Sequence, residues 1–385
     1  MRPLSIAHLT TFLQGGAGRA IVDLACAQHA AGHEVLVLAS ATGAPGYGNY
    51  PHHLARLRDA GVPLVLEDSL FTRDLALNRR AQEALTRARP RGRLDLIHAH
   101  AGTPARIARH YAAAVDAAVA VLQTQHGWGS RKTAEQARQD LMVLDEVDRV
   151  VVTSDATRAL LVSHGVPRAH VETIPCGIPA DPPDGTAVDA ARLAAHLRAR
   201  GWSVVGCIGS IDANKNQRLL VEALARPDAR GVAAILVGEG GEAMAELARG
   251  LGLGDRVHAV GYQPDADRWL PAFELLVVPS LTEGQGLAPI EAFRAGIPVV
   301  ASAIPPLEQL VTDGEHGWLF DPCDAAALAR TIVRALRMPD DERHRMRAAA
   351  RRRFDARYTV PIMVARHEAL YRRLVDDRRR QPVVA

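Results

Sequence analysis

Lysine is almost absent from this sequence. Only Lys132 and Lys215 occur among the 46 basic residues of the 385-residue chain, and the formal net charge is +3. A charge this close to neutral gives no reason to expect a nucleic-acid partner. Because arginine takes almost every other basic position, a remaining lysine indicates a site where ammonium and guanidinium are not interchangeable.

Paired cysteines and long apolar segments are absent as well. The four cysteines lie far apart and form no CxxC pair, which argues against a zinc site or a disulfide framework and favours a reducing, cytoplasmic location. No apolar run approaches the roughly 20 residues of a membrane span. With 48% hydrophobic residues the chain can bury large cores, and its length favours two domains.

The sequence instead repeats short apolar strands, polar turns and helices. We predict an opening unit with a strand at 4–9, a glycine loop at 15–19, a helix at 20–31 and a second strand at 35–39. The loop lacks the GxGxxG spacing, and Ser40 stands where an acidic residue would follow the second strand. A nicotinamide site is therefore disfavoured.

A segment rich in Pro, Asp and Gly at 178–186 predicts a linker between two α/β halves. After it the pattern starts again, with a strand at 203–208, a loop at 209–216 and a helix at 217–225. The part from residue 324 onward is mostly helical in pattern and rich in arginine. The sequence thus predicts two α/β domains in series.

Residues 283–302, EGQGLAPIEAFRAGIPVVAS, predict an anion site. Together with the apolar run at 275–279 they indicate strand, loop, helix and strand, and Pro289 suits the first helical turn. The glycine turn then lies at a helix N-terminus, where free N–H groups and the helix dipole favour phosphate. Glu283 precedes this turn and Glu291 is expected inside the first turn of the helix. A ligand that uses every feature would carry phosphate and hydroxyls, as a sugar nucleotide does. An ordinary βα turn whose glutamate complements the dipole stays open as an alternative.

Three histidines are expected at strand ends of the first half. His98 and His100 end the strand predicted at 94–98, and His126 follows the one at 119–124. The ligand crevice of an open parallel sheet lies beyond the carboxyl ends of its strands, which favours a functional role for His126. For the other two, a ligand role and a structural role stay equally open.

In this order the motifs resemble those of the retaining glycosyltransferases of family 4, which have the GT-B fold. Glu283, seven residues and Glu291 look like the signature of that family. The other motifs are Gly15-Gly16-Ala17-Gly18-Arg19, Asp95-Leu96-Ile97-His98-Ala99-His100, His126-Gly127, Ile174-Pro175-Cys176-Gly177-Ile178, the Lys215 loop, Val237-Gly238-Glu239-Gly240 and Gly261-Tyr262. The combined order, which runs nearly from end to end, is highly specific.

The resemblance implies an α/β fold of two Rossmann-like domains that face each other across a donor cleft. Residues 1–178 would form the acceptor-side domain, with a C-terminal helix at 359–385 packing back on it. Residues 179–358 would form the nucleotide-sugar-binding domain.

The resemblance also implies roles for single residues. In the family the first glutamate of the signature lies near the donor sugar hydroxyls and the second binds the ribose. The residues expected to be catalytic are Lys215, Glu283 and His126, and those expected to bind the donor are Gly16, Ser210, Gly286, Leu287, Ala288 and Glu291.

One position departs from the family pattern. Ser210 stands where the family usually has an arginine that helps to hold the phosphates. The charge of the leaving group would then rest on Lys215, the helix N-terminus and the Ser210 hydroxyl, with Arg19 and Arg131 as candidate replacements.

The expected activity is transfer of a hexosyl unit from a UDP- or GDP-linked sugar to an acceptor hydroxyl with retention, without a metal or other cofactor. The acceptor would be a glycan, a lipid or a small molecule, in glycan, glycolipid, lipopolysaccharide, exopolysaccharide or small-glycoside biosynthesis. Two alternatives stay open, a nucleotide-sugar 2-epimerase of similar fold and a non-catalytic GT-B subunit. Asp265-Ala266-Asp267 is interpreted as helix capping and not as a metal-binding DxD motif.

A basic stretch at 73–93 interleaves arginines with Leu75, Leu77 and Leu85. Its arginines are Arg73, Arg79, Arg80, Arg87, Arg89, Arg91 and Arg93. Such a face can dock on anionic lipid at the inner side of a membrane. We favour the other interpretation, an ordinary solvated face in an arginine-biased protein. The loops at 43–51 and 66–73 carry no recognisable acceptor code, and nothing in the sequence indicates an oligomeric state.

Overall fold

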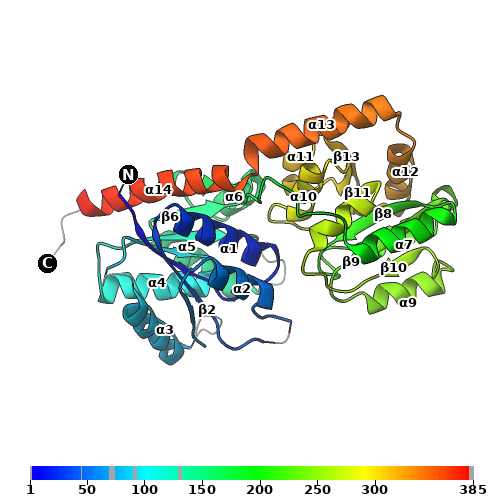
Figure 1. Ribbon diagram of the computed structural model, residues 1–385. Coiled ribbons are helices and arrows are strands. Elements are labelled where there is room, and N and C mark those ends of the chain that lie inside the picture. The colour runs from blue at the N-terminus through cyan, green and yellow to red at the C-terminus, as the bar shows by residue number, and fades with distance from the viewer. Residues whose placement is uncertain (1, 45, 69–73, 90–92, 129–131, 381–385) are drawn as a thin grey trace. The chain divides into compact units, whose positions relative to one another are not determined.

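The computed structural model describes residues 2–44, 46–68, 74–89, 93–128 and 132–380. The chain forms two compact units, Met1–Ile178 with Thr359–Ala385, and Pro179–Tyr358 (Figure 1). The boundary after Ile178 falls at the start of the segment that the sequence predicts to be a linker.

The first unit is built on a seven-stranded parallel sheet in the order β3-β2-β1-β4-β5-β6-β7. Its strands are β1 (Ser5–Leu9), β2 (Glu34–Ala39), β3 (Leu64–Leu66), β4 (Leu96–Ala99), β5 (Ala120–Gln125), β6 (Arg149–Val152) and β7 (Val171–Thr173). Its helices are α1 (Gly15–Ala30), α2 (Pro51–Asp59), α3 (Leu75–Ala88), α4 (Gly102–Ala114), α5 (Ala134–Glu146), α6 (Asp155–Ser163), the 3-10 helix η2 (Arg168–His170) and α14 (Val360–Arg380). The central strands are buried along their length because helices cover a parallel sheet on both faces.

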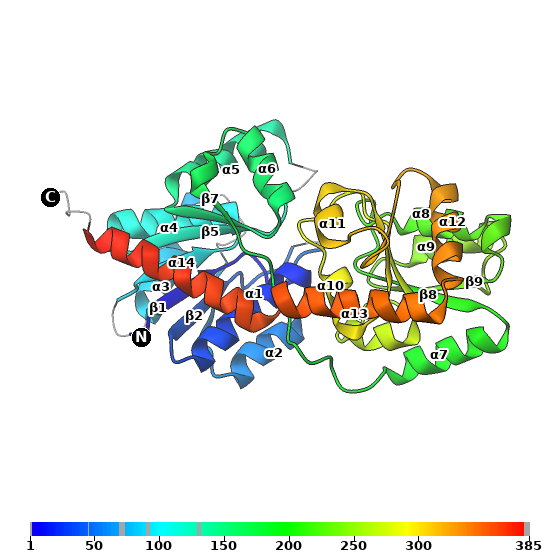
Figure 2. The ribbon, with the colours of Figure 1, turned by 90° about the horizontal axis from the view of Figure 1, so that it is seen from above.

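Helix α14 returns to the first unit after the chain has built the second. Leu370, Tyr371 and Leu374 pack against Ile6 of β1 and Leu122 of β5, and Figure 2 shows α14 running beside α1. This confirms the predicted packing of the C-terminal helix on the N-terminal domain.

The return of the chain depends on a glycine at the crossing point. The backbone N–H of Val360 donates to the carbonyl of Ile178 at 3.0 Å. A Cβ on Gly177 would lie 2.3 Å from the carbonyl oxygen of Thr359, so no larger residue fits there.

The second unit contains a six-stranded parallel sheet in the order β10-β9-β8-β11-β12-β13. Its strands are β8 (Ser203–Ile208), β9 (Val232–Val237), β10 (Val257–Ala259), β11 (Leu275–Val278), β12 (Val299–Ser302) and β13 (Gly317–Phe320). Its helices are α7 (Val188–Ala199), α8 (Gln217–Leu224), α9 (Glu242–Gly250), α10 (Leu287–Ala295), α11 (Pro305–Leu310), α12 (Ala325–Leu336) and α13 (Asp340–Arg357), with the 3-10 helices η3 (Pro227–Ala229) and η4 (Ala266–Ala272). The predicted strand at 203–208 coincides with β8.

The predicted loop at 15–19 is wrong, because α1 already begins at Gly15. Gly18 permits close packing at the start of the helix. A Cβ on Gly18 would lie 2.5 Å from the backbone carbonyl carbon of Leu13. Gly16 is exposed in the first turn, where backbone N–H groups have no intrahelical acceptor.

Among the described residues, no helix combines the length and the apolar character that crossing a bilayer requires.

Candidate functional site

In the second unit the strand order reverses between β8 and β11: the strands that follow β8 in the chain first lie on one side of it and then, from β11, on the other. In an open α/β sheet the ligand crevice lies at such a point, beyond the carboxyl ends of the strands. A pocket of about 280 Å³, including its open mouth, lies there. It is lined by Cys207, Ile208, Lys215, Gln217, Val278, Pro279, Ser280, Glu283, Gly286, Leu287, Ala288 and Pro289. The structure thus brings together five of the predicted site residues.

Lys215 and Glu283 form an ion pair in this pocket. The lysine Nζ lies 2.6 Å from Oε1 of Glu283, and the two side chains are 31% and 9% exposed. The same Oε1 accepts a hydrogen bond from the Ser280 hydroxyl at 2.8 Å. Because an ammonium group has three N–H donors, Lys215 can contact an anion and keep Glu283 as a partner.

Asp212, which was not predicted from the sequence, organises the loop that carries Lys215. Its Oδ1 accepts the backbone N–H groups of Asn214 at 2.8 Å and Lys215 at 3.1 Å. Burial acts to raise the pKa of this carboxyl, but these hydrogen bonds, that from Ser210 and the lysine charge outweigh it and lower the pKa. An aspartate that accepts backbone N–H groups just after itself is an Asx turn, the signal that would have revealed it.

Ser210 makes a different contact from the one predicted. Its hydroxyl donates to Oδ2 of Asp212 at 2.9 Å, and the residue is exposed and does not line the pocket. The structure thus gives Ser210 a role in the loop itself. Of the candidate replacement arginines, Arg19 lies 3.8 Å from the Asp23 carboxylate, and Arg131 lies outside the described residues.

Helix α10 points its N-terminus at the pocket. Gly286 precedes the helix with φ of 92°, a conformation that favours glycine. The N–H groups of Leu287 and Ala288 belong to the first turn and have no acceptor within the helix. The prediction that Glu291 lies in the first turn is wrong, since that turn contains no acidic residue. Glu291 is 6% exposed and is not among the pocket-lining residues.

Cys207 contributes an inert surface to the pocket. Burial raises the pKa of its thiol to about 12. The nearby Lys215 charge acts to lower this pKa, and the Glu283 charge acts to raise it. The thiol is therefore neutral at physiological pH, and thiolate chemistry is disfavoured.

The interpretation of Asp265-Ala266-Asp267 as helix capping is wrong, because the expected capping hydrogen bond is not formed. Asp265 occupies the N-cap position of η4, but its side chain makes no capping hydrogen bond. Asp267 forms a buried ion pair with Arg294, 2.8 Å from Nη2. A structural partner therefore accounts for this carboxylate.

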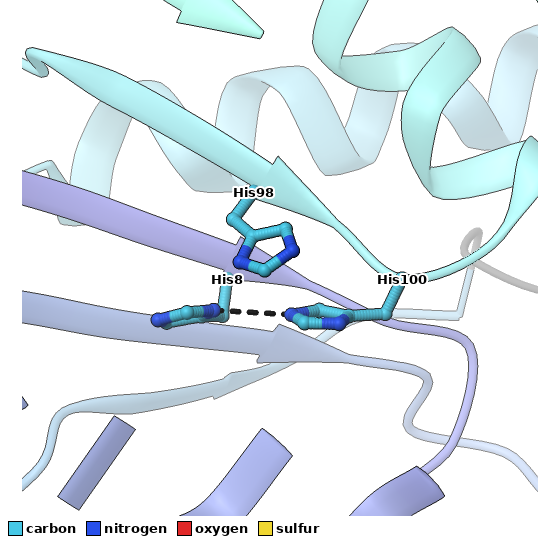
Figure 3. Close-up of side chains that lie close together, drawn as sticks. All are labelled: His8, His98 and His100. Carbon is cyan, nitrogen blue, oxygen red and sulfur yellow. Dashed lines mark hydrogen bonds between the residues drawn. The ribbon is translucent and has the colours of Figure 1, made fainter. Parts of the chain in front are cut away.

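The first unit brings four of its histidines together on one face of the sheet. The register of β1 and β4 pairs His8 with His98, and residues two apart on a strand share a face. His100 follows on the same side, and His8 Nδ1 lies 3.1 Å from its Nε2 (Figure 3). His126 joins from the end of β5, with Nε2 3.1 Å from Nδ1 of His100. The structure thus connects all three predicted histidines with His8, which was not predicted.

His98 has a structural role. Its Nδ1 lies 2.6 Å from the Tyr371 hydroxyl and its Nε2 2.6 Å from the Thr124 hydroxyl. Its ring packs on that of His100, with the centroids 4.0 Å apart. The residue therefore ties α14 to β4 and β5.

Facing nitrogens of His8, His98 and His100 lie within 4.8 Å of one another, a spacing that suits a metal ion. The hydrogen bonds argue for a different use. Both nitrogens of His98 and both nitrogens of His8 already have partners. The three side chains are buried and include no carboxylate, so a dication would be buried without a compensating charge.

The four histidines on this face of the sheet and His367 of α14, whose ring centroid lies 5.4 Å from that of His98, form a cluster that should make the first unit sensitive to acid. Burial, reinforced for His98, His100 and His367 by neighbouring imidazoles, lowers every pKa below 6.5, to about 4 for His8, His126 and His367 and well below 6.5 for His98 and His100. Between pH 6.5 and 4 these histidines bind protons in the unfolded chain but stay neutral in the folded chain. The stabilisation is therefore complete above pH 6.5 and is lost as the pH falls toward 4.

We expect the unfolding free energy to fall by up to ~1.4 kcal/mol per pH unit for each such histidine. Scanning calorimetry from pH 7.5 to pH 4.5 measures the slope. His367→Gln should reduce the slope of the unfolding free energy against pH by the contribution of about one proton. Replacement of the exposed His196 by Gln should leave the slope unchanged. A flat pH dependence of the first unit's transition would contradict the prediction.

The basic stretch at 73–93 lies partly outside the described residues, which exclude Arg73 and Arg91 and any description of the Leu75 and Leu77 side chains. Leu85 is buried in the core of the first unit and is not part of an exposed face. Arg80 lies 3.0 Å from the Glu67 carboxylate.

Comparison with known proteins relates this geometry to a family. Residues 194–353 match glycosyl transferases group 1, and residues 14–181 match Glycosyltransferase Family 4. A D-inositol 3-phosphate glycosyltransferase of Streptomyces avermitilis is 31% identical over 357 residues, which cover 83% of this chain and 75% of the relative. The chain belongs to glycosyltransferase family 4. The enzyme of the same name from Mycolicibacterium smegmatis is 29% identical over 314 residues, 76% of this chain and 70% of that protein.

The glycosyltransferase also shares its fold with a solved structure, Anabaena Alr3699/HepE in complex with UDP and glucose. The TM-score is 0.81 at 20% sequence identity, and the match covers 96% of this chain and 100% of that one. Two Rossmann-like α/β domains of the GT-B class are thus confirmed. His126 and Gly16 belong to the first unit of this glycosyltransferase, and the other predicted site residues to the second.

Proposed function

We propose that this glycosyltransferase transfers a hexosyl unit from a nucleotide diphosphate sugar to an acceptor hydroxyl with retention, without a metal. One observation carries the proposal: Lys215, Glu283 and the N-terminus of α10 line one pocket. The ammonium group and the free N–H groups supply fixed positive charge where a departing diphosphate would accumulate negative charge. The solved relative crystallised with UDP and glucose supports a nucleotide-sugar donor.

The carboxylate of Glu283 has a separate task in this proposal. It accepts hydrogen bonds from Lys215 and Ser280 through Oε1, and its other oxygen can accept a sugar hydroxyl. The ribose of the nucleotide would be bound by Glu291. The diphosphate would be held by Gly286, Leu287 and Ala288. We further propose a cytoplasmic location and a role in glycan, glycolipid or small-glycoside biosynthesis.

The test begins with a thermal-shift screen of UDP- and GDP-linked sugars, because a donor at 100 times its Kd adds about 2.7 kcal/mol of stability. The donor found is then offered to a panel of acceptors that includes inositol 3-phosphate, after the relatives named above. NMR of the product reports its anomeric configuration, and EDTA tests for a metal. An inverted product, or activity lost in EDTA and restored by a divalent cation, would refute the corresponding part of the proposal.

Gly286→Ala should weaken donor binding about tenfold or more. The positive φ disfavours any side chain, and a new Cβ would lie 3.2 Å from Cδ2 of Leu307 and 3.3 Å from Cγ of Pro289. Strain of this kind is worth about 1–3 kcal/mol and would shift the loop that begins α10. Donor Kd by calorimetry measures the effect.

Gly250→Ala is the matched control. Gly250 ends α9 and has no atom within 4 Å of a new Cβ. It should bind donor like the parent, and equal affinity of the Gly286 variant would show that the strained turn does not position the phosphates.

A further inference from the structure

A continuous hydrogen-bonded chain of side chains crosses the buried face of the first sheet. It starts at Gln28 on α1, whose Oε1 lies 2.8 Å from Nε2 of His8. From His8 it continues to His100 and then to His126, each step 3.1 Å long. Gln28 and His8 are fully buried, and His100 is 7% exposed. His126 is partly buried at the end of the chain.

The direction of the protons along this chain is set at its buried end. A neutral imidazole has one N–H donor and one acceptor nitrogen, and the low pKa values keep these rings neutral at pH 7. The carbonyl oxygen of Gln28 can only accept, so His8 carries its proton on Nε2 and accepts at Nδ1. His100 then donates from Nε2 and accepts at Nδ1. His126 in turn donates from Nε2.

The outer nitrogen of His126 is consequently an acceptor. Its Nδ1 has no hydrogen-bond partner among the described residues, and it follows a strand end at the edge where ligands bind. If the side-chain amide of Gln28 were rotated so that its NH₂ group faced His8, every proton in the chain would shift, and Nδ1 of His126 would carry a proton. In the structure Oε1 of Gln28 faces His8 at 2.8 Å. Burial raises the pKa of the nearby Tyr371 hydroxyl, and the Gln28 amide acts in the opposite direction, as an N–H donor does. The Nε2 atom of Gln28 makes no hydrogen bond within the usual distance and angle limits to any described residue.

We propose that Gln28 is a positioning residue for His126: through His8 and His100 it fixes the tautomer that presents a lone pair at Nδ1 to a substrate hydroxyl. The tautomer follows from the chain itself, and its use by a substrate hydroxyl rests on the proposed function. Gln28 lies too deep to touch substrate, so its effect on turnover would be indirect.

The first measurement is nitrogen NMR of histidine-labelled protein at pH 7.5, with His126→Gln to assign the signal. We expect a pyridine-like Nδ1 and a pyrrole-like Nε2 in His126. Gln28→Leu removes the acceptor and should give a mixture of tautomers, whereas Gln28→Glu keeps an acceptor at that place and should preserve the parent pattern. His100→Phe cuts the chain at its middle and should have the effect of Gln28→Leu.

His367→Gln is the matched control, because His367 belongs to the same cluster but bonds to the Met363 carbonyl. It should leave the tautomer of His126 unchanged. A protonated Nδ1 in the parent protein, or a parent-like His126 in both Gln28→Leu and His100→Phe, would overturn the proposal.

Turnover provides the second readout. We expect Gln28→Leu to lower kcat about tenfold with little change in KM for the donor, and Gln28→Glu to recover most of it. An altered tautomer with parental kcat would show that no hydroxyl uses the lone pair. If no nucleotide sugar is turned over by the parent, the proposed function fails, but the NMR result still decides whether Gln28 sets the tautomer.

Discussion

Replacing Lys215 with alanine should lower kcat about 100- to 1000-fold, the range found when a preorganised group that stabilises developing charge is removed. The side chain sits in the pocket beside the α10 N-terminus and pairs with Glu283 at 2.6 Å. Ser210 replaces the arginine of the family pattern and is bonded to Asp212, so the ammonium group is left with most of the task. Steady-state kinetics with the donor found by thermal shift measure the loss.

Lys132→Ala is the matched control, since it removes the other lysine of the chain. Lys132 lies 2.7 Å from the Asp140 carboxylate and 3.9 Å from the centre of the Trp128 ring, contacts within the first unit. It should retain turnover within a few-fold. Lys215→Arg separates charge from shape, because guanidinium does not reproduce a compact ammonium group. Turnover of Lys215→Ala within a few-fold of the parent would remove Lys215 from the mechanism.

The strands were predictable because buried parallel strands leave continuous apolar runs between turn residues. The run at 203–208 became β8 with the same bounds. The start of α1 was not predictable in this way, because glycine next to glycine signals a loop. At Gly18 the glycine instead permits a close approach to the Leu13 backbone, and a sequence does not reveal how closely a helix approaches the preceding segment.

The start of α10 at the pocket was also predictable, since Pro289 and the glycine turn are local signals of a helix N-terminus. The histidine chain was not. His8 meets His98 because β1 and β4 are neighbours, and Tyr371 meets His98 across 273 residues. Both contacts depend on strand order and on the return of α14, which no local pattern encodes.

Arg294→Met should destabilise the second unit by about 3–5 kcal/mol, because it leaves a buried carboxylate without its counter-charge. The Arg294 and Asp267 side chains are 1% and 8% exposed and lie 2.8 Å apart. Arg294 also donates to the carbonyls of Pro179 and Asp181, so it fastens the start of the linker to α10. Denaturant unfolding of a Trp128→Phe background isolates the second unit, which holds the other three of the four tryptophans.

A double-mutant cycle distinguishes the ion pair from the loss of packing. Asp267→Leu alone leaves the arginine buried and unpaired, whereas Arg294→Met combined with Asp267→Leu removes both charges and should recover part of the stability. Arg218→Met is the surface control, because the pair with Glu222 is 68% and 37% exposed and such pairs contribute below ~1 kcal/mol. If Arg294→Met cost no more than Arg218→Met, the ion pair would not hold α10.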